Sequence, residues 1–409
     1  MYLDFIKKLF GILLLISACG GSEVNNESVL INSNSTLGKT TTTLTVITND
    51  DKKVILQVLN NNLLTDGPNL KNFEDKFAKF TGAKYAIGVS NATAALQLSL
   101  KAIGIQKGDE VIVPDITFVA TANAVIFADA TPVIADISEH DFNISLNSIE
   151  KSITKKTKAI IPVHFAGKPC QMIKIKSLAK KHGIKIIEDC AHAIGSKYNK
   201  QHVGTFGETG CFSFYPTKNL TTFEGGMVIT NSKKISDKIK LLRNHGIMKS
   251  LQDRFSKGKP WDYDVLIPGY NYRLDEIRSA LGANQLKRIL VNNKKRRNAF
   301  LYYNSALEDK TDLIVPSMEK NEIHSCHLYI LRIKKNKLFS RDTIFQKFLK
   351  NGIRSSVHYK PLHEFSVYKK YGKTYDDLSN SKKLFKEFLS LPLYPQITKK
   401  QQNLVIDNL

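Results

Sequence analysis

A single lysine, Lys218, lies between two apolar runs that would hold its amine in one place. Residues 211–215 precede it and are rich in aromatic side chains, and the pair Gly225-Gly226 after it leads into a second apolar run at 227–230. A lysine held in this way is the group through which proteins carry pyridoxal phosphate (PLP), as a Schiff base. The segment alone also suits a solvated surface lysine, so the interpretation depends on a second segment.

That second segment ends in a carboxylate. Residues 184–189 read Ile-Lys-Ile-Ile-Glu-Asp, which predicts a buried strand ending at Asp189, 29 residues before Lys218. An acid there can pair with the pyridine nitrogen of PLP and keep it protonated, because a close opposite charge shifts a pKa by roughly 1–3 units. His192, three residues further on, can contact the phenolic oxygen of the ring. The alternatives are a helix-capping Asp189 and a His192 satisfied near the core.

Two more segments offer a phosphate cup and a stacking surface. The turn at 90–95 (Ser-Asn-Ala-Thr-Ala-Ala) lies between a predicted strand and a predicted helix, where free N–H groups attract anions, and Thr93 adds a hydroxyl. Ser213, five residues before Lys218, adds another hydroxyl. Phe118 follows Pro-Asp-Ile-Thr at 114–117 and can stack on a flat heterocycle. The alternatives are an ordinary helix cap and a core aromatic.

The elements that would position these residues alternate between strands and helices from about residue 51. Apolar runs predict strands at 85–89, 110–114, 131–136, 159–163 and 184–188. Helical spacing and cap residues predict helices at 52–60, 70–80, 92–103, 118–127, 172–182 and 275–286. Crossover connections of this kind imply an α/β fold with a mostly parallel sheet, whose ligands bind outside the carboxyl ends of the strands. A smaller α+β unit is predicted from about residue 290, with a strand at 327–333 and helices at 342–350 and 378–388.

Composition sets few limits on function. The 409 residues carry a formal charge of +23, which suits either an anionic partner or a lysine-rich background of solvated faces. The basic residues are scattered, the densest run is at 294–297, and no nucleic-acid motif accompanies it, so we expect no nucleic-acid partner. The five cysteines form no C-x-x-C pair and no zinc pattern, so we expect neither a disulfide framework nor a metal.

The first fifty residues differ from the rest. Lys7 and Lys8 precede a short apolar stretch at 9–16 and then Ser-Ala-Cys19, a pattern typical of a lipoprotein-type signal at 1–19. The stretch is too short to span a bilayer. Residues 20–50 are rich in Ser, Asn, Thr and Gly, as a tether would be. The chain would meet a membrane only through a lipidated Cys19; the alternative is an unused leader on a cytoplasmic body.

Together these segments resemble the DegT-type nucleotide-sugar aminotransferases, a branch of the aspartate aminotransferase superfamily (PLP fold type I). The resemblance runs from about residue 51 to 409. It rests on Leu-Thr-Asp-Gly-Pro at 64–68, Ser-Asn-Ala-Thr-Ala-Ala-Leu at 90–96, Thr-Phe-Val-Ala-Thr-Ala-Asn at 117–123, Pro-Val-His-Phe-Ala-Gly-Lys-Pro-Cys at 162–170, Glu-Asp-Cys-Ala-His-Ala-Ile-Gly at 188–195, the Lys218 segment, Arg-Asn-His-Gly-Ile at 243–247 and Gly-Tyr-Asn-Tyr-Arg-Leu at 269–274.

The resemblance implies a large PLP-binding domain at 51–290 and a small C-terminal domain at 291–409. It implies that Lys218 is the catalytic residue and forms the covalent link to PLP. The residues that it assigns to the cofactor are Thr93, Ala94 and Ser213 on the phosphate, Phe118 on the ring, Asp189 on the pyridine nitrogen and His192 by the phenolic oxygen. Asn271 would reach the phosphate of a neighbouring subunit, which implies a homodimer with shared sites.

The implied reaction is transfer of an amino group from glutamate to a nucleotide-linked keto-sugar. The stretch at 162–170 looks most like the subgroup that aminates C4 of UDP-4-keto-6-deoxy-N-acetylhexosamines, on the way to pseudaminic-acid-type sugars. Another nucleotide keto-sugar (C3 or dTDP-linked) and a non-catalytic lipidated binding protein remain alternatives. A related sugar 3-dehydratase would carry a histidine in place of Lys218.

Overall fold

The structure is a computed structural model that describes residues 47–60, 63–247, 261–334 and 339–409. The predicted signal, Cys19 and most of the predicted tether lie outside these residues. The first described helix, α2 (Asn49–Leu59), begins inside the range predicted as tether. All described residues belong to one compact unit, so the domain boundary at residue 290 stays a prediction.

The main feature of the described residues is an eight-stranded sheet. Its strands, in order across the sheet, are β1 (Tyr85–Val89), β9 (Gly226–Thr230), β8 (Thr209–Ser213), β5 (Lys185–Asp189), β4 (Thr157–Ile160), β2 (Glu110–Pro114), β3 (Thr131–Ala135) and β13 (Lys373–Thr374). The pairs from β8 to β13 are parallel, and β9 is antiparallel to both β8 and β1. The mostly parallel sheet predicted from the sequence is confirmed.

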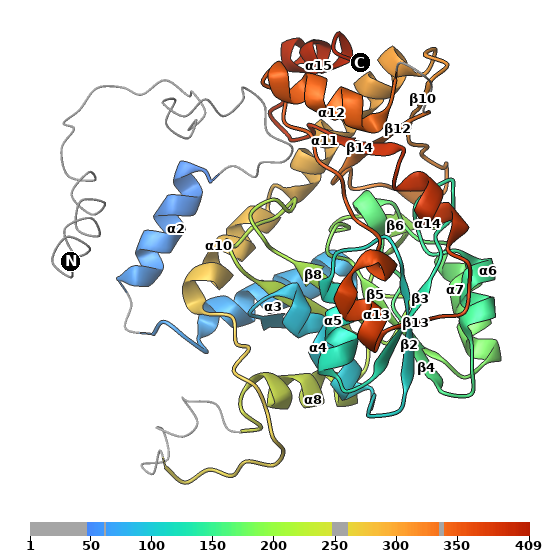
Figure 1. Ribbon diagram of the computed structural model, residues 1–409. Coiled ribbons are helices and arrows are strands. Elements are labelled where there is room, and N and C mark those ends of the chain that lie inside the picture. The colour runs from blue at the N-terminus through green and yellow to red at the C-terminus, as the bar shows by residue number, and fades with distance from the viewer. Residues whose placement is uncertain (1–46, 61–62, 248–260, 335–338) are drawn as a thin grey trace, which may run out of the picture. The chain divides into compact units, whose positions relative to one another are not determined.

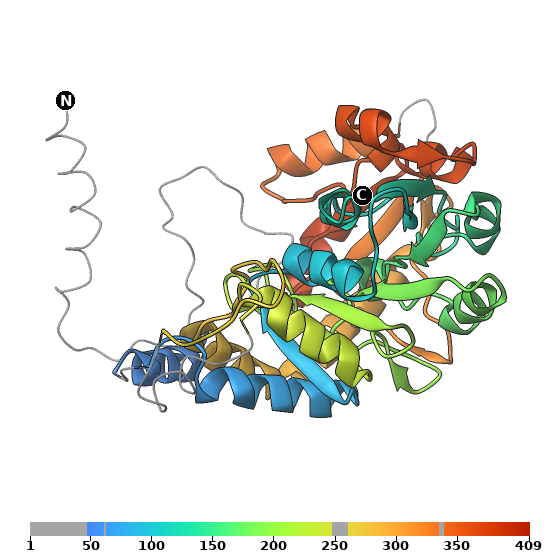
Figure 2. The same ribbon diagram turned by 90° about the horizontal axis from the view of Figure 1, so that it is seen from below.

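The apolar runs become strands because both faces of this sheet are buried. Successive residues alternate between two layers of helices, as the period of two requires. In β2, Val111 and Val113 join the core formed with α4 (Ala92–Ala102), α5 (Ala120–Phe127) and α8 (Lys233–Arg243), whereas Ile112 joins the core formed with α6 (Leu146–Ser152) and α7 (Met172–Lys181). Figures 1 and 2 show helices packed on both sides of the strands.

The remaining helices cover the ends of the sheet and form the C-terminal part. They are α3 (Pro68–Thr81), α10 (Glu276–Leu286), α11 (Ile289–Leu307), α12 (Arg341–Lys350), α13 (Ser366–Tyr371), α14 (Ser379–Leu384) and α15 (Lys399–Ile406). The helices predicted at 70–80, 92–103, 172–182, 275–286 and 342–350 are found within two residues at each end. Helix α4 begins where the sequence predicts, with the Asn91 side chain accepting from the Ala94 N–H.

The C-terminal part contains a second, three-stranded sheet, which we call the C-terminal sheet. It consists of β10 (Leu313–Ile314), β12 (Tyr329–Ile333) and β14 (Phe388–Leu391). The helix predicted at 378–388 is wrong in its second half, because α14 ends at Leu384 and Phe388 starts a fully buried strand. A third, small sheet has β6 (Lys197–Tyr198) in its centre, paired with β11 (Glu322–Ile323) on one side and β7 (Gln201–His202) on the other. It connects the C-terminal part to the loops after β5.

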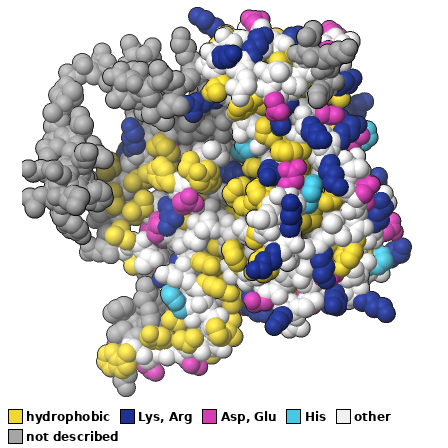
Figure 3. All heavy atoms as spheres, in the orientation of Figure 1, with side chains coloured by type: hydrophobic (Ala, Val, Ile, Leu, Met, Phe, Trp, Pro, Cys, Tyr) yellow, Lys and Arg dark blue, Asp and Glu magenta, His cyan; other side chains and the backbone are white. Residues whose placement is uncertain are grey.

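No helix among the described residues is long and apolar enough to cross a bilayer. On the face drawn in Figure 3, Lys and Arg side chains are scattered and form no continuous stripe. This distribution agrees with the interpretation of the positive charge as a solvated background.

Candidate active site

Asp189 and Lys218 come together because β5 and β8 are neighbours in the sheet. Asp189 is the last residue of β5 and pairs in parallel register with Cys211 of β8. Lys218 lies in the turn after β8, where its N–H donates to the Tyr215 carbonyl over 2.9 Å. The charges of the two side chains influence each other's pKa. The site therefore forms at the carboxyl edge of the sheet, as predicted for open α/β sheets.

Asp189 is a buried carboxylate bonded to neutral donors. Thr121 Oγ1 donates to its Oδ2 over 2.8 Å, and the Ala191 N–H donates to its Oδ1 over 3.1 Å. Burial raises the pKa of Asp189, and these two hydrogen bonds and the charge of Lys218 offset the rise only in part. A cation placed against this carboxylate would be strongly attracted to it, because little water is present to screen the two charges.

Burial shifts the pKa of the Lys218 amine in the opposite direction, downward. Solvent reaches part of the residue, but the protein packed around the amine lowers the pKa of Lys218 to about 8, against a smaller opposing effect of Asp189. A substantial fraction of this amine is therefore neutral near physiological pH. A neutral amine is the form that attacks a carbonyl or accepts a proton.

Neutral imidazoles surround this pair. His192 follows β5, and His327 and His358 come from the C-terminal part; burial lowers the pKa of all three, and the charge of Lys218 adds to the effect. The rings of His192 and His327 lie 4.4 Å apart between centroids. His192 Nε2 lies 3.1 Å from the Tyr359 hydroxyl, while its buried Nδ1 has no partner among the described residues.

A polar cup lies where α4 begins. The Thr93 hydroxyl makes no hydrogen bond within the described part of the chain, and Ser213 Oγ accepts only a 3.4 Å bond from the Tyr215 N–H. Strand β9 passes close because Gly226 has no side chain; a Cβ there would lie 2.6 Å from the Asn91 carbonyl carbon. Since Ser213 pairs with Gly226, the Ser213 and Thr93 hydroxyls border the same helix start. The predicted Ala94 N–H is already engaged, donating to Asn91 Oδ1 over 2.8 Å.

Phe118 and Asn271 occupy exposed positions around the site. Phe118 keeps 56% of its surface exposed, and its ring lies 5.7 Å from that of Tyr359. Phe118 lies in the connection between β2 and α5, and this exposure leaves ring surface available for stacking. Asn271 is exposed on a segment that pairs with the strand leading to α4, through the bond from the Ser90 N–H to the Tyr272 carbonyl (2.9 Å).

The group His164, Glu188 and Cys190 has the ligand types and proximity of a metal site, but its atoms are used within the protein. His164 Nδ1 accepts from the Cys170 N–H, so its Nε2 carries the proton toward Glu188. Glu188 also accepts three backbone N–H groups, from Gly204, Phe206 and Gly207. Burial raises the pKa of the Cys190 thiol well above its ordinary value. The hydrogen bonds of this group therefore stabilise the end of β5, which carries Asp189.

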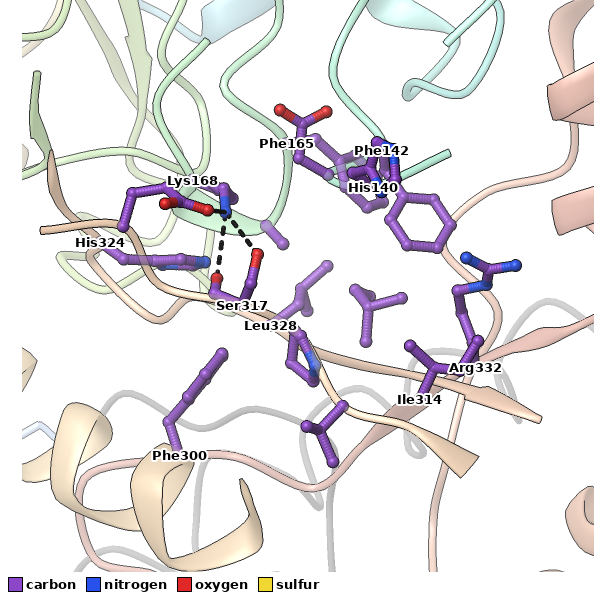
Figure 4. Close-up of a pocket in the computed structure, with 16 residues that line it drawn as sticks. His140, Phe142, Phe165, Lys168, Phe300, Ile314, Ser317, His324, Leu328 and Arg332 are labelled. Atoms are coloured by element: carbon purple, nitrogen blue, oxygen red, sulfur yellow. Dashed lines mark hydrogen bonds and ion pairs between the residues drawn. The ribbon is translucent and has the colours of Figure 1, made fainter. Parts of the chain in front are cut away.

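A separate cavity of about 380 Å³ is lined in part by Phe165, whose ring lies 6.2 Å from that of His192. Figure 4 shows Lys168, Ser317 and His324 gathered at one end of it and Arg332 at the other. Lys168 donates to the Ser317 carbonyl and hydroxyl and pairs with Glu322, and Arg332 pairs with Glu139 and Glu387. The two basic side chains that line this cavity, Lys168 and Arg332, are thus matched by acids within the protein.

Sequence reasoning missed the residues that reach the site from a distance. Thr121 lies on α5, and Tyr359 and His327 lie in the C-terminal part. Asn219 is the neighbour of Lys218 in the chain, yet its bond to His327 spans 108 residues. Thr121 falls inside a matching stretch of the resemblance, at 117–123, and could have been singled out there. No spacing in the sequence indicates His327 or Tyr359.

A fold of this type, with a buried strand-end carboxylate beside a lysine of lowered pKa, is typical of PLP-dependent transaminases. The profile of the DegT/DnrJ/EryC1/StrS aminotransferase family matches residues 45–409, and the chain belongs to this family. It is a PLP-dependent aminotransferase of the sugar-modifying kind.

Individual relatives agree with this assignment. The spore coat polysaccharide biosynthesis protein SpsC of Bacillus subtilis is 40% identical over 345 residues, which cover 84% of this chain and 89% of SpsC. The structure is similar to that of Helicobacter pylori PseC, an aminotransferase involved in the biosynthesis of pseudoaminic acid, with a TM-score of 0.84, 32% identity and coverage of 90% of this chain and 97% of PseC. It is also similar to Streptococcus pneumoniae Spr1654, assigned as a sugar aminotransferase, in its PLP form (TM-score 0.82, 29% identity, 90% of this chain and 96% of Spr1654 covered).

Three features of the site suit this cofactor. The Asp189 carboxylate lies beside neutral donors, where a protonated ring nitrogen would be attracted. The buried His192 Nδ1 lacks a partner within the described chain, which leaves it for a ligand atom. The Thr93 hydroxyl borders the α4 start, where N–H groups favour an anion.

Proposed function

We propose that this protein moves the amino group of glutamate onto a nucleotide-linked 4-keto-6-deoxy sugar, with a UDP-4-keto-6-deoxy-N-acetylhexosamine as the substrate. The observation that carries the chemistry is the pairing of Lys218 and Asp189 at the edge of β5 and β8. The similarity to PseC and the stretch at 162–170 support the choice of sugar.

Each side chain of the site has a defined role in this proposal. Lys218 binds PLP covalently, and once released it takes the proton from the donor carbon, a task suited to an amine of pKa about 8. Asp189 holds the ring nitrogen in its protonated form, and bound PLP then supplies an electron sink for the negative charge left at that carbon. Thr93 and Ser213 bind the phosphate, the side chain of Phe118 stacks on the ring, and His192 contacts the phenolic oxygen.

The same site runs both halves of the reaction. The keto-sugar arrives after glutamate has left as its keto acid, and Lys218 returns the proton to the sugar carbon. The neutral imidazoles of His192 and His358 lie beside Lys218 without adding charge. They offer hydrogen bonds to hydroxyl groups of a sugar, for which charged side chains are not required.

We propose that the active form is a homodimer in which Asn271 of one protomer reaches the phosphate bound by its partner. Asn271 is exposed in the single chain. Large apolar side chains are exposed on α2 and just after it, and in the segment that leads to Asn271. They are Leu56, Leu59, Leu64, Trp261, Val265 and Leu266. Figure 3 shows that hydrophobic side chains gather in several places on the face drawn there. Burial of such side chains between two copies would remove them from water.

We place this catalytic body in the cytoplasm, where nucleotide-linked keto-sugars are made. The alternative is a body tethered to a membrane through a lipidated Cys19. Both arrangements use the same chemistry at Lys218, so they differ in where the enzyme is found and not in what it catalyses.

The experiment that tests the proposal supplies purified, PLP-loaded protein with glutamate and a panel of UDP- and dTDP-linked 3-keto and 4-keto sugars. We expect an aminated product from the UDP-4-keto-6-deoxy-N-acetylhexosamine and loss of turnover in Lys218→Ala. Borohydride reduction followed by peptide mapping should place PLP on residue 218. Turnover confined to a dTDP-linked or 3-keto sugar would overturn the substrate, and a folded, PLP-supplemented protein without an adduct at Lys218 would overturn the site.

A further inference from the structure

A segment of the C-terminal part, residues 324–328, inserts between loops of the large sheet. Ser325 Oγ donates to the His192 carbonyl over 2.8 Å, and the His327 N–H donates to the Ala166 carbonyl over 3.0 Å. Gly167 makes this approach possible: its φ is +93°, and a Cβ there would lie 2.2 Å from Ser325 Oγ. The segment is therefore held in one position, against the loop residues that follow β4 and β5.

Asn219, the residue after Lys218, is bonded to this segment through every polar atom of its side chain. Its Nδ2 donates to Asn293 Oδ1 over 2.8 Å and to the Ser325 carbonyl over 2.9 Å. Its Oδ1 lies 3.1 Å from His327 Nδ1. Because both acceptors face Nδ2, Oδ1 must face His327, and His327 Nδ1 must carry the proton. Asn219 is only 4% exposed, so water cannot replace these bonds.

The environment of His327 keeps this bond in one form. Burial, together with the neighbouring His192 and Lys218, lowers the pKa of His327 well below its ordinary value. The ring is therefore neutral at physiological pH and holds a single proton, which the bond to Asn219 places on Nδ1. Its Nε2 has no hydrogen-bond partner among the described residues, so Asn219 is the group that orients the ring.

We infer that His327 is a positioning residue: through Asn219 it fixes Lys218, so that the place of the reactive amine is set by the C-terminal part. The inference rests on the proposed role of Lys218. A buried Asn219 Oδ1 that loses its donor must turn or shift to find another, because an unsatisfied buried acceptor is unfavourable. Lys218 is bonded covalently to Asn219 and moves with it.

The consequence that can be measured is the pKa of the Lys218 amine. It is lowered by the packing around the amine, and a lysine held less firmly gains water, which raises its pKa. The titratable groups that interact with the charge of this amine are Asp189, His192, His327 and His358. Tyr359 lies next to them, with its hydroxyl 3.1 Å from His192 Nε2. The three imidazoles stay neutral around pH 8 because their pKa values are lowered, so they do not produce a midpoint there.

The test compares His327→Leu with His327→Asn. An asparagine side chain carries an N–H close to the place of the imidazole Nδ1–H and can still donate to Asn219, whereas leucine cannot. The rate at which PLP combines with the PLP-free protein is measured across neutral and alkaline pH, since the neutral amine is the reacting form. We expect a midpoint at about 8 in the unaltered protein. In His327→Leu it should rise by about one unit, which lowers the rate near pH 8 about fivefold.

In His327→Asn the midpoint should stay with that of the unaltered protein, with rates within about twofold. Asn293→Ala, which removes another partner of Asn219, should move the midpoint upward as well. The matched control is His324→Asn, because His324 is equally buried on the same segment, is neutral since burial lowers its pKa to about 3, and lines the cavity that Phe165 also lines. The asparagine Oδ1 can replace the His324 Nδ1 that accepts from the Cys326 N–H, so the segment keeps this internal hydrogen bond. This control should leave the midpoint unchanged.

An unchanged midpoint in both His327→Leu and Asn293→Ala would overturn the inference. An equal shift in His327→Asn and His327→Leu would overturn it too, because the retained donor would then make no difference. Failure of the proposed site has a different signature, since the unaltered protein would not bind PLP at residue 218. Thermal unfolding of each PLP-free variant separates a lowered stability, which any core substitution can produce, from a moved midpoint.

Discussion

Replacing Asp189 with asparagine removes the carboxylate charge beside Lys218 and keeps the shape of the side chain. The new Oδ1 can accept from the Ala191 N–H as before. The new Nδ2 can donate to Thr121 Oγ1, whose own proton can turn to Thr117 Oγ1, 2.9 Å away. The hydrogen bonds of the site therefore survive the substitution, and the loss is confined to the charge.

The size of the effect follows from that charge. A close carboxylate raises the pKa of a cationic partner by roughly 1–3 units, and each unit is worth about 1.4 kcal/mol. If the protonated ring nitrogen is needed when the donor carbon loses its proton, the half-reaction with glutamate should slow by about 10-fold to 1,000-fold. The stability of the PLP-free protein should not fall at neutral pH, because burial already raises the pKa of Asp189 and makes its charge unfavourable there.

The assay is a single-turnover measurement in which glutamate is mixed with PLP-loaded protein and the absorbance of the bound cofactor is followed. Asp136→Asn is a suitable control, since Asp136 is a buried carboxylate just after β3 that accepts from Ser381 and Asn380, away from Lys218. A rate constant for Asp189→Asn within threefold of the unaltered protein (roughly 0.6 kcal/mol) would refute the pairing with the ring nitrogen. A collapse of the PLP-free fold would refute the reasoning about hydrogen bonds.

Two further predictions concern the N-terminal part of the chain. Asp51→Ala should lower the free energy of unfolding by about 2–4 kcal/mol in urea denaturation at neutral pH, since it leaves Arg288 and Asn284 without their buried acceptor. The control, Asp50→Ala, changes an exposed neighbour and should have little effect. Equal losses of stability in the two variants would contradict a stabilising role of the buried Asp51 carboxylate. Burial opposes ionisation of Asp51, but hydrogen bonds from Arg288 and Thr48 outweigh it and lower its pKa below 3.8, so the difference between Asp51→Ala and the unaltered protein should persist above about pH 4 and shrink as the pH falls through the lowered pKa. Removal of residues 1–46 should leave the activity with glutamate unchanged in a soluble product, and a folded but inactive product would show that the leader takes part in catalysis.

The strands were predictable from sequence where apolar runs are uninterrupted. The structure has β1 and β2 at the predicted residues. The strand predicted at 159–163 ends early, at Ile160. Pro162 has no N–H to donate, and the pairing with β5 resumes only as a single bridge between Val163 and Asp189. The helix predicted across Phe388 failed for another reason: its apolar residues fit a helical period, but the chain turns after α14 and buries Phe388 in the C-terminal sheet.

The residues of the site also fall into those that could be predicted from the sequence and those that could not. Lys218 and Asp189 could be predicted together because both follow strands, and parallel strands end at one edge of a sheet. His327 and Tyr359 could not, because their approach depends on how the C-terminal part folds back over 108 and 167 residues of chain to Asn219 and His192. Nothing in the local sequence records such a contact; it follows from the packing of Ser325 and His327 against Gly167 and Ala166.

Burial unites the chemistry of this site. Loss of water makes any isolated charge unfavourable, so it raises the pKa of acids and lowers the pKa of bases. It lowers the pKa of His192, His327 and His358 so far that they stay neutral, and it brings the pKa of Lys218 down to about 8. It raises the pKa of Asp189, which then gains most from a cationic partner. Among these groups it is therefore Lys218 whose protonation changes just above neutral pH, and a protein that positions this amine also decides when it reacts.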